Sequence, residues 1–582
     1  MPFSGNDAGG FRWEGFNSGA PSQKSRRPAQ QRKPRKPMSN TKRTLANILV
    51  TLVVGLLYFY FELPAINFHD ASFYTFVLLL CLVYCVCAVI TSGFHADSVK
   101  GYFQFVKKQC LIPAGVAVAL LVVILIGALV GATIFRAGAY ASLLEIQTGD
   151  FATEVEEISY DQIPMLDKDS AERLGDRKLG ELSDMVSQFE VNEDYTQINY
   201  QGRPVRVATL RYADAIKWMT NRGDGLPAYL LVDMVDQSVE LVRLEEGIRY
   251  TTSEHFGRNL YRYLRFRYPT YMFGEAVMEV DESGVPYWVC PRIVKTIGLF
   301  GGTDIKGGVL VNAITGEHQY YEEVPSWVDN LYNAELIMEQ YDYYGMYHNG
   351  FFNSIFGQRD VTVTTEGYNY IAIDDDVYVY TGVTSVGGDQ SNVGFILTNQ
   401  RTKETHFYEV AGATEYSAMA SAEGELQNLR YTATFPLLLN VSGQPTYFMA
   451  MKDEAQLVKK YAMVNVNQYQ IVATGDTVAE CERNYTQMLR EEGIVTEDSG
   501  GADSSLDTVD GTVAEIRSAV LNGNTYYYIR FIGSEVYYAL SALENPEAII
   551  LNEGDQVTIS YRAGDAALPE RGILEGTSVT LR

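Results

Sequence analysis

The stretch Gly284–Val324, GVPYWVCPRIVKTIGLFGGTDIKGGVLVNAITGEHQYYEEV, is the most complete copy of a pattern that recurs in this chain of 582 residues. A Gly-x-Pro turn opens the stretch, and a Gly-Gly corner separates two apolar, aromatic segments. A polar turn around Gly316 joins the last two segments. Gly and Pro mark turns, whereas Val, Ile, Thr and Tyr favour strands. The stretch therefore predicts antiparallel β-hairpins.

Parts of the pattern occur before and after this stretch. The tripeptides Gly225-Leu226-Pro227 and Gly443-Gln444-Pro445 each precede an apolar segment, as Gly284-Val285-Pro286 does. Residues Val311–Glu322 align without gaps on Thr398–Glu409, and the two segments share Asn, Thr, Glu, Tyr and Glu. A strand, a tight polar turn and a returning aromatic strand account for these residue types. The sequence therefore predicts repeated β-rich units.

This hairpin, with its VNxxTGExxxY signature, resembles the hairpin of PepSY-type modules of bacterial envelope proteins. The resemblance covers about 15 residues per copy, and Lys403 departs from it at the turn position where the first copy has glycine. It implies protein or peptide binding and carries no catalytic residues. The whole layout resembles three-span membrane proteins of Gram-positive (Firmicutes-type) bacteria with a large extracytoplasmic domain, which implies a location only.

Three apolar segments precede the repeats, and each has about the length, roughly 20 residues, that a membrane-spanning helix needs. They are residues 44–61, 71–93 and 111–135. The tail 1–43 carries ten basic and two acidic residues, and the connection 94–110 carries three lysines. The connection 63–70 carries neither lysine nor arginine. The positive-inside rule therefore predicts a multi-pass protein of the cell membrane with a cytoplasmic N-terminus and an extracytoplasmic C-terminal part.

The part of the chain after Arg136 is strongly acidic. Of 46 basic and 72 acidic residues in the whole chain, 14 and 5 lie at or before Arg136, which leaves 32 and 67 and a net charge of −35. Nucleic acid would be repelled by this charge. Nucleic acid is therefore a poor candidate partner for the large domain.

Two glycines of the third apolar segment, Gly127 and Gly131, form a small-xxx-small face that lets backbones approach closely. We expect this face to pack against the chain's own membrane helices. Dimerisation through the same face, giving a homo-oligomer, is the alternative.

Six aromatic residues lie within a short segment between the copies of the hairpin: Tyr343, Tyr344, Tyr347, Phe351, Phe352 and Phe356. One interpretation is a core segment that bridges two repeats. The other is a surface that faces a partner or lipid, because aromatic side chains supply a large contact area.

We expect an α+β fold in which the membrane helices precede the β-rich repeats. The final residues alternate as five or six short strands, which favours a small barrel with the OB fold as the leading candidate. The predicted divisions are a disordered basic tail (1–43), a three-helix membrane region (44–136), a membrane-proximal helical segment (137–200), two α+β repeat regions (201–330 and 331–490), an acidic Gly/Ser linker (491–510) and an OB-like barrel (511–582).

Residue patterns typical of catalysis are absent from the sequence. It contains no GxSxG, HExxH, GxxxxGK[ST] or GxGxxG motif and no paired CxxC. His318 and His406 lie on the two hairpins, but one residue out of register. Cys290 and Cys481, the two cysteines of the large domain, either form one disulfide or are buried thiols. We therefore assign no catalytic residue, cofactor or metal.

These observations favour a non-enzymatic, membrane-anchored envelope protein whose outer domain binds a protein, peptide or wall component. A subunit of an envelope assembly or secretion complex is one alternative, in which the helices do more than anchor. An extracytoplasmic hydrolase that uses carboxylates is the other.

Overall fold

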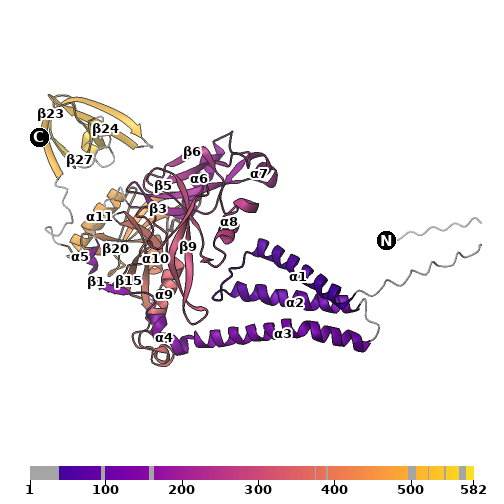
Figure 1. Cartoon of the computed structure of the whole chain (residues 1–582). Helices are drawn as coiled ribbons and strands as arrows, with labels where there is room; N and C mark the ends of the chain where they lie inside the picture. Colours follow the sequence, from indigo (N-terminus) through magenta and orange to yellow (C-terminus); the bar gives the residue numbers. More distant parts are fainter. Residues whose placement is uncertain are drawn as a thin grey trace, which may run out of the picture. The chain divides into compact units, whose positions relative to one another are not determined.

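The computed structural model describes residues 39–93, 99–155, 163–373, 375–387, 391–495, 506–521, 524–542, 545–562 and 572–581 (Figure 1). Nearly all of the predicted basic tail and half of the predicted Gly/Ser linker, residues 496–505, lie outside these residues. The described chain is a mixed α+β protein in which three apolar helices precede a β-rich part.

Three of the described helices are long and apolar enough to cross a membrane: α1 (Asn40–Glu62), α2 (Ala71–Gly93) and α3 (Val99–Val130). The prediction of three apolar spans is confirmed at this level, and their orientation stays a prediction. Helix α3 begins at Val99, so most of the connection 94–110 is helical. A break at Gly131 and Ala132 separates α3 from the short helix α4 (Thr133–Ala141), which contains the end of the predicted third span.

The described residues divide into two compact units. One comprises residues 39–54, 80–93 and 99–116, and the other comprises 55–79 and the described residues from Ala117 on. In the first unit, hydrogen bonds join the helices: Thr91 bonds Asn47 at 3.1 Å, and Gln109 donates to Thr44 Oγ1 at 3.0 Å. The repeats and the contacts described below belong to the second unit.

The second unit contains four copies of one supersecondary unit, which we name repeats A to D. Each copy begins with a helix and continues with five strands. The third strand pairs with the first and second strands along one edge and with the fourth strand along the other, and the fifth strand pairs with the fourth. All the pairs within a copy are antiparallel.

The bounds of the elements follow chain order. Repeat A contains α6 (Lys168–Gly180), β2 (Phe189–Val191), β3 (Thr196–Tyr200), β4 (Arg203–Tyr212), β5 (Leu226–Asp233) and β6 (Val239–Ile248), with α7 (Ala215–Asn221) inserted after β4. Repeat B contains α8 (Leu260–Arg267), β7 (Met272–Phe273), β8 (Val277–Val280), β9 (Pro286–Ile297), β10 (Gly301–Asn312) and β11 (His318–Tyr321), and η2 (Phe256–Arg258) precedes it.

Repeats C and D have the same order of elements. Repeat C contains α9 (Ala334–Tyr347), η3 (Asn353–Gly357), β12 (Thr362–Thr364), β13 (Asn369–Ile373), β14 (Asp376–Ser385), β15 (Ser391–Asn399) and β16 (Thr405–Tyr408). Its sheet also includes β1 (Ile146–Gly149), parallel to β16, and β17 (Gly412–Ala413), while α5 (Phe151–Glu154) follows β1. Repeat D contains α10 (Glu415–Glu425), β18 (Thr432–Ala433), β19 (Leu437–Val441), β20 (Gln444–Lys452), β21 (Val458–Asn465), β22 (Val472–Gly475) and α11 (Val478–Glu491).

The predicted boundary at residue 201 falls inside repeat A. Strands β2 and β3, which precede it, pair with β4, and α6 packs its buried Ala171 and Leu179 on the same core. The predicted helical segment 137–200 is therefore partly a component of the first sheet.

A tight turn precedes the third strand of repeats A, B and D, and each of these strands begins at or one residue before a proline. In A and D, both central residues have positive φ: Gln201 and Gly202 at 55° and 75°, Ser442 and Gly443 at 53° and 71°. Two positive φ angles suit the right-handed twist of a hairpin. The turn of repeat A is thus Gly202-Arg203-Pro204, whereas the predicted copy at Gly225 opens the fourth strand.

The predicted hairpin alignment corresponds to the turn between the fourth and fifth strands. In repeat B the Asn312 side chain accepts hydrogen bonds from the N–H groups of Ile314 and Thr315, at 3.0 and 2.9 Å. In repeat C the Asn399 side chain accepts them from Arg401 and Thr402, at 2.9 and 3.0 Å. Asp233 takes this role in repeat A and Asn465 in repeat D. Asn and Asp stabilise such turns because they bond the backbone ahead of them.

The repeats pack as two pairs. The cores of A and B merge through side chains such as Leu210, Leu230, Trp288 and Val309, and those of C and D merge through Tyr380, Phe395, Tyr447 and Met463. The opposite faces of B and C are covered by residues 324–347: Leu336 packs on repeat B and Ile337 on repeat C. The start of α9 therefore forms the junction between the two pairs.

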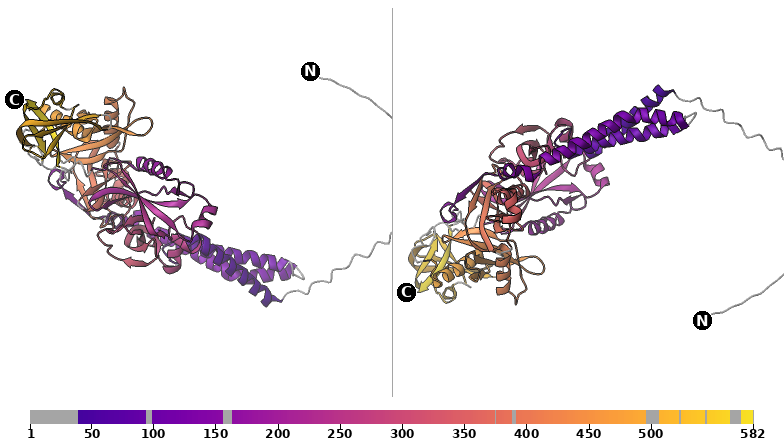
Figure 2. Two further views of the ribbon diagram at one scale, coloured as in Figure 1. Left: turned by 90° about the horizontal axis from the view of Figure 1, so that it is seen from above. Right: turned by 90° about the horizontal axis from the view of Figure 1, so that it is seen from below.

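A five-stranded closed barrel ends the described chain, drawn in yellow in Figure 2. Its elements are β23 (Leu506–Leu521), β24 (Asn524–Phe531), β25 (Tyr537–Ser541), η4 (Pro546–Ile549), β26 (Gln556–Arg562) and β27 (Ile573–Leu581). The strand order is β23-β24-β25-β27-β26, and β23 closes the barrel on β26. This agrees with the predicted small barrel.

Candidate functional site

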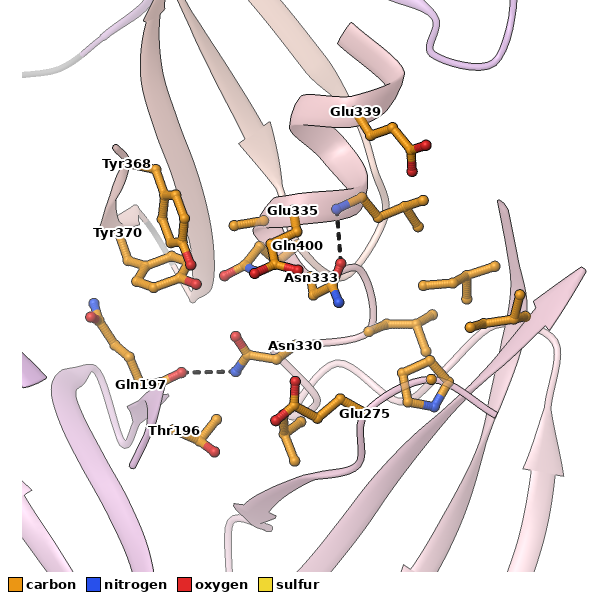
Figure 3. A pocket seen from close by; sticks show the side chains of 18 of the residues that line it. Thr196, Gln197, Glu275, Asn330, Asn333, Glu335, Glu339, Tyr368, Tyr370 and Gln400 are labelled. Atoms are coloured by element: carbon orange, nitrogen blue, oxygen red, sulfur yellow. Dashed lines mark hydrogen bonds between the residues drawn. The ribbon is translucent and has the colours of Figure 1, made fainter. Parts of the chain in front are cut away.

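A cavity of about 380 Å³ lies where repeats A, B and C meet (Figure 3). We name it the junction pocket. Strand β3 and the start of β4 form one wall, repeat B forms a second, and the start of α9 with β13 and Gln400 forms the third. Ligand sites favour such concave positions between domains.

Strand pairing places two buried polar side chains at the pocket. Gln197 on β3 stands directly opposite Arg206 on β4, and the Arg206 guanidinium donates to Gln197 Oε1 at 3.4 Å. Asn330 on the junction segment donates to the Gln197 backbone carbonyl at 2.8 Å (Figure 3). Arg206 and Gln197 are 6% and 3% exposed. Burial lowers the pKa of Arg206 from its ordinary value.

Four residues that line the pocket each have a buried polar atom that makes no hydrogen bond within the described residues: Tyr195 Oη, Gln197 Nε2, Arg206 Nε and Gln400 Oε1. Gln400 is 1% exposed, and its Nε2 is already bonded to the Tyr332 carbonyl at 3.0 Å. A buried polar atom without a partner costs about 1–3 kcal/mol. Arg206 and Gln197 thus have one unused donor each and Gln400 one unused acceptor beside the cavity, a set that suits a ligand with amide-like groups.

Carboxylates and tyrosines face the same cavity. Glu275 comes from repeat B, and Glu335 and Glu339 come from the first turns of α9. None of the three forms an ion pair within the described part of the chain. The hydroxyl groups of Tyr368 and Tyr370 point toward Glu335 and Gln400 (Figure 3). Negative charge beside aromatic rings favours a cationic group.

A pair of buried carboxyl groups holds the junction together near the pocket. Glu279 on β8 accepts the backbone N–H groups of Asp329 and Asn330, both at 2.8 Å. Asp329 in turn accepts the Asn199 N–H at 2.7 Å. Burial raises the pKa of Glu279 to about 7. Burial also raises the pKa of Asp329, and the negative charge of Glu279 raises it further. The pair therefore retains a proton near neutral pH.

The predicted glycine face contacts a β-hairpin. A Cβ atom at Gly127 would lie 2.6 Å from Leu299 Cδ2, and one at Gly131 would lie 3.3 Å from the Ile297 carbonyl. Both neighbours belong to the tip of the β9–β10 hairpin, residues 297–301. The tip also bonds the α1–α2 connection, because His69 Nδ1 lies 2.9 Å from the Leu299 carbonyl. The close approach that the glycines permit thus serves repeat B, whereas the expected neighbour was another membrane helix.

Helix α8 makes a second connection between repeat B and the helix ends. Arg265 is 8% exposed and donates to the carbonyls of Leu63 at 2.8 Å and Tyr271 at 2.6 Å. Arg262 donates to the Tyr60 carbonyl at 3.0 Å and lies over the Tyr60 ring. Repeat B is therefore held to the adjoining ends of the apolar helices by its hairpin tip and by α8.

The six predicted aromatic residues divide between two environments. Tyr343, Tyr344 and Tyr347 lie on α9 and are half-buried. Phe351 is also half-buried, whereas Phe352 and Phe356 are 65% and 80% exposed. None of the six lines the junction pocket.

The remaining candidate residues have separate structural neighbours. His318 bonds the Tyr268 hydroxyl at 2.9 Å, whereas His406 lies 3.3 Å from Glu404 and 3.6 Å from Glu154. Cys290 and Cys481 are both buried and unpaired. Among the described residues no group of three or more His, Cys, Asp or Glu side chains is arranged to hold a metal ion.

Sequence reasoning missed the junction pocket because its residues come from three repeats. The one local indication was the presence of polar residues within apolar strand segments, as at Gln197 on β3 and Arg206 on β4. In comparisons with known proteins, no protein-family model matches the sequence, and no curated protein shows significant similarity to it.

Proposed function

We propose that this chain is a membrane-anchored envelope protein whose outer, β-rich part binds a peptide-like ligand in the junction pocket. The observation that supports this most is the set of buried, unpaired amide and guanidinium atoms at Gln197, Arg206 and Gln400. A protein interior satisfies most such groups, and a ligand in the cavity would supply the partners that these side chains lack. The proposed role is non-enzymatic.

The chemistry of the pocket supports a particular kind of peptide. Its amide and guanidinium groups match the alternating donors and acceptors of a peptide backbone. The carboxylates of Glu275, Glu335 and Glu339 favour an amino group, as at an N-terminus or a lysine side chain. Apolar residues such as Ile293 and Leu336 complete the wall.

The location and family are part of the same proposal. The basic residues at the cytoplasmic side of the predicted spans support an extracytoplasmic position for the repeats. The helix followed by paired strands supports a PepSY-like relationship, in keeping with peptide binding. For the barrel, the parallel pairing of β25 with β27 supports an OB-like fold.

Calorimetric titration of the detergent-solubilised full-length protein would test the ligand class. The probe is a pool of synthetic tetrapeptides, Ala-Xaa-Lys-Ala, with a matched pool in which both amino groups are acetylated. We expect members of the first pool to bind and acetylation to weaken binding about 10–100-fold, because a hydrogen bond to a charged group contributes about 1.5–3 kcal/mol.

Two variants locate the effect. Glu335→Gln should weaken binding of the free-amine peptides, whereas Glu323→Gln, at an exposed position outside the pocket, should not. Equal binding of both pools would refute the amine assignment. Binding by neither pool would refute the proposal of a peptide ligand, and cleavage of the peptides would favour the hydrolase alternative.

A second candidate function is supported by the contacts of repeat B with the helix ends. The hairpin tip at Leu299 and the buried Arg265 connect the repeats directly to the membrane helices. Such contacts suit a subunit of an envelope complex in which the helices organise the assembly in addition to anchoring the chain. Affinity purification of the native protein and of Gly127→Leu would test this role, because the same partners with both proteins would count against a helix-organised complex.

A further inference from the structure

Large apolar side chains are exposed on the turn that follows α9. Phe352, Ile355 and Phe356 expose 65%, 50% and 80% of their surfaces. We name residues 351–357 the phenylalanine loop. A cluster of this kind on an ordered turn indicates a contact surface.

The loop has a defined conformation. Its π-helical turn η3 is closed by Gln358, whose N–H donates to the Asn353 carbonyl at 2.7 Å and whose φ of 47° is left-handed. The Asn353 side chain also donates to the Arg359 carbonyl at 2.8 Å. The backbone therefore holds the apolar side chains outward by specific bonds.

The loop belongs to the end of α9 that packs beside the end of the membrane-length helix α3. Helix α4 follows α3 after two residues and packs on α9 (Figure 1). Tyr140 on α4 donates to the Gly131 carbonyl at 2.8 Å, and its ring meets Tyr343 edge to face at 4.7 Å. One tyrosine thus connects the last residues of α3 to α9.

A row of rings leads from this contact to the loop. Tyr343 stacks on Tyr347 with ring centres 6.2 Å apart, and Tyr347 stacks on Phe351 at 6.0 Å. Phe351 then meets Phe352 edge to face at 5.8 Å. The exposed phenylalanines therefore continue an aromatic row that begins at the membrane-length helix.

The charges around the loop suit a lipid surface. Residues 343–359 contain no Asp or Glu and include His348 and Arg359, although the part of the chain after Arg136 has a net charge of −35. Residues 131–144, which include α4, also contain no acidic residue, and Ile134 and Phe135 on α4 are 45% and 64% exposed. Apolar and aromatic side chains with flanking basic groups are typical of the membrane–water interface.

We propose that the phenylalanine loop inserts into the interfacial region of the bilayer that α1–α3 cross, in the leaflet at the C-terminal end of α3. The exposed faces of α4 and the loop form one lipid-contacting surface. The bilayer is the partner because the surface is joined to α3 by the chain itself and lacks acidic residues. This contact is independent of the peptide-binding proposal, and it would fix the height of repeat C above the membrane.

Tryptophan fluorescence of the full-length protein in lipid nanodiscs tests the inference. Phe356→Trp places a probe on the loop, and Tyr416→Trp places a matched probe on α10, where Tyr416 is 51% exposed. Emission of the native protein, with its four tryptophans, is subtracted. Phe352→Trp provides a second probe if Phe356→Trp lowers the yield.

The loop probe should emit at shorter wavelength than the control and lose most of its added emission in nanodiscs made with brominated lipid. Aqueous iodide should quench the control and spare the loop probe. Equal response of the two probes to brominated lipid would overturn the inference. A loop probe protected from both quenchers would also overturn it and indicate that protein covers the loop.

Discussion

The buried carboxyl pair at the junction of the repeats makes stability depend on pH in a direction opposite to that of most carboxylates. Glu279 is fully buried, and its two oxygens accept the N–H groups of Asp329 and Asn330. Burial raises its pKa from 4.5 to about 7. The folded chain therefore binds a proton between these values that the unfolded chain has released.

The sign and size follow from proton linkage. A folded pKa above the unfolded one means that the Glu279 contribution is fully present below pH 4.5 and is lost as the pH rises to about 7. The difference corresponds to about 3 kcal/mol. For a unit of 150–250 residues, such as repeats A and B together, this is a fall in Tm of about 6–12 °C.

Thermal unfolding of the full-length protein in detergent, followed by tryptophan fluorescence between pH 5 and pH 8, measures this effect. The described tryptophans, Trp218, Trp288 and Trp327, all lie in repeats A and B or directly after them. Glu279→Gln should reduce the fall in Tm, and adding Asp329→Asn should abolish it, because burial also raises the pKa of Asp329. Glu317→Gln, at an exposed turn of the same repeat, is the control and should unfold like the native protein.

If Tm falls with pH in the double variant as steeply as in the native protein, the assignment of the proton to this pair is refuted. A Tm that rises from pH 5 to pH 7 in the native protein would refute the sign.

Two further predictions concern the contacts of repeat B with the helix ends. Gly127→Leu should lower stability by about 1–3 kcal/mol, because a Cβ there already lies 2.6 Å from Leu299. Gly115→Leu should have little effect, since nothing lies within 4 Å of its Cβ, and equal melting of the two variants would refute the contact. Arg265→Ala should increase deuterium exchange in residues 62–70 about 10–100-fold, because it removes a charged hydrogen bond to the Leu63 carbonyl. Unchanged exchange would show that α8 does not hold this connection.

Local patterns predicted much of the fold. The hydropathy of the first 136 residues indicated the three long helices, and the alternation after residue 510 indicated the barrel. The hairpin turns at Asn312 and Asn399 were predicted because each asparagine bonds backbone N–H groups that lie only two and three residues ahead of it.

The fourfold repetition was only partly visible in the sequence. In the corresponding turns of repeats A and D, the side chains of Asp233 and Asn465 accept the same kind of backbone hydrogen bond. The residues around them differ from those of repeats B and C. In repeat C, Lys403 adopts a φ of 68° in place of the glycine, and its ammonium group bonds Asp304 at 2.7 Å. The physical requirement is thus maintained by different residues, which a search for identical letters does not detect.

The candidate sites depended on contacts distant in the sequence. The neighbour of Gly127 lies at Leu299, and the junction pocket joins Gln197, Asn330 and Gln400. Each of these residues is ordinary in its local context. These side chains come together only because repeat A packs on repeat B, repeat C packs on repeat D, and α9 lies between the two pairs.

The most direct test of the proposed function is hydrogen–deuterium exchange of the full-length protein with and without the tightest-binding free-amine tetrapeptide. Binding in the junction pocket should slow exchange together in residues 195–206 of repeat A, residues 368–371 of repeat C, and residues 330–339, which span the junction and the start of α9. Protection should be absent in Glu335→Gln at the same peptide concentration. Protection confined to another part of the chain, or to one of these segments alone, would contradict the account.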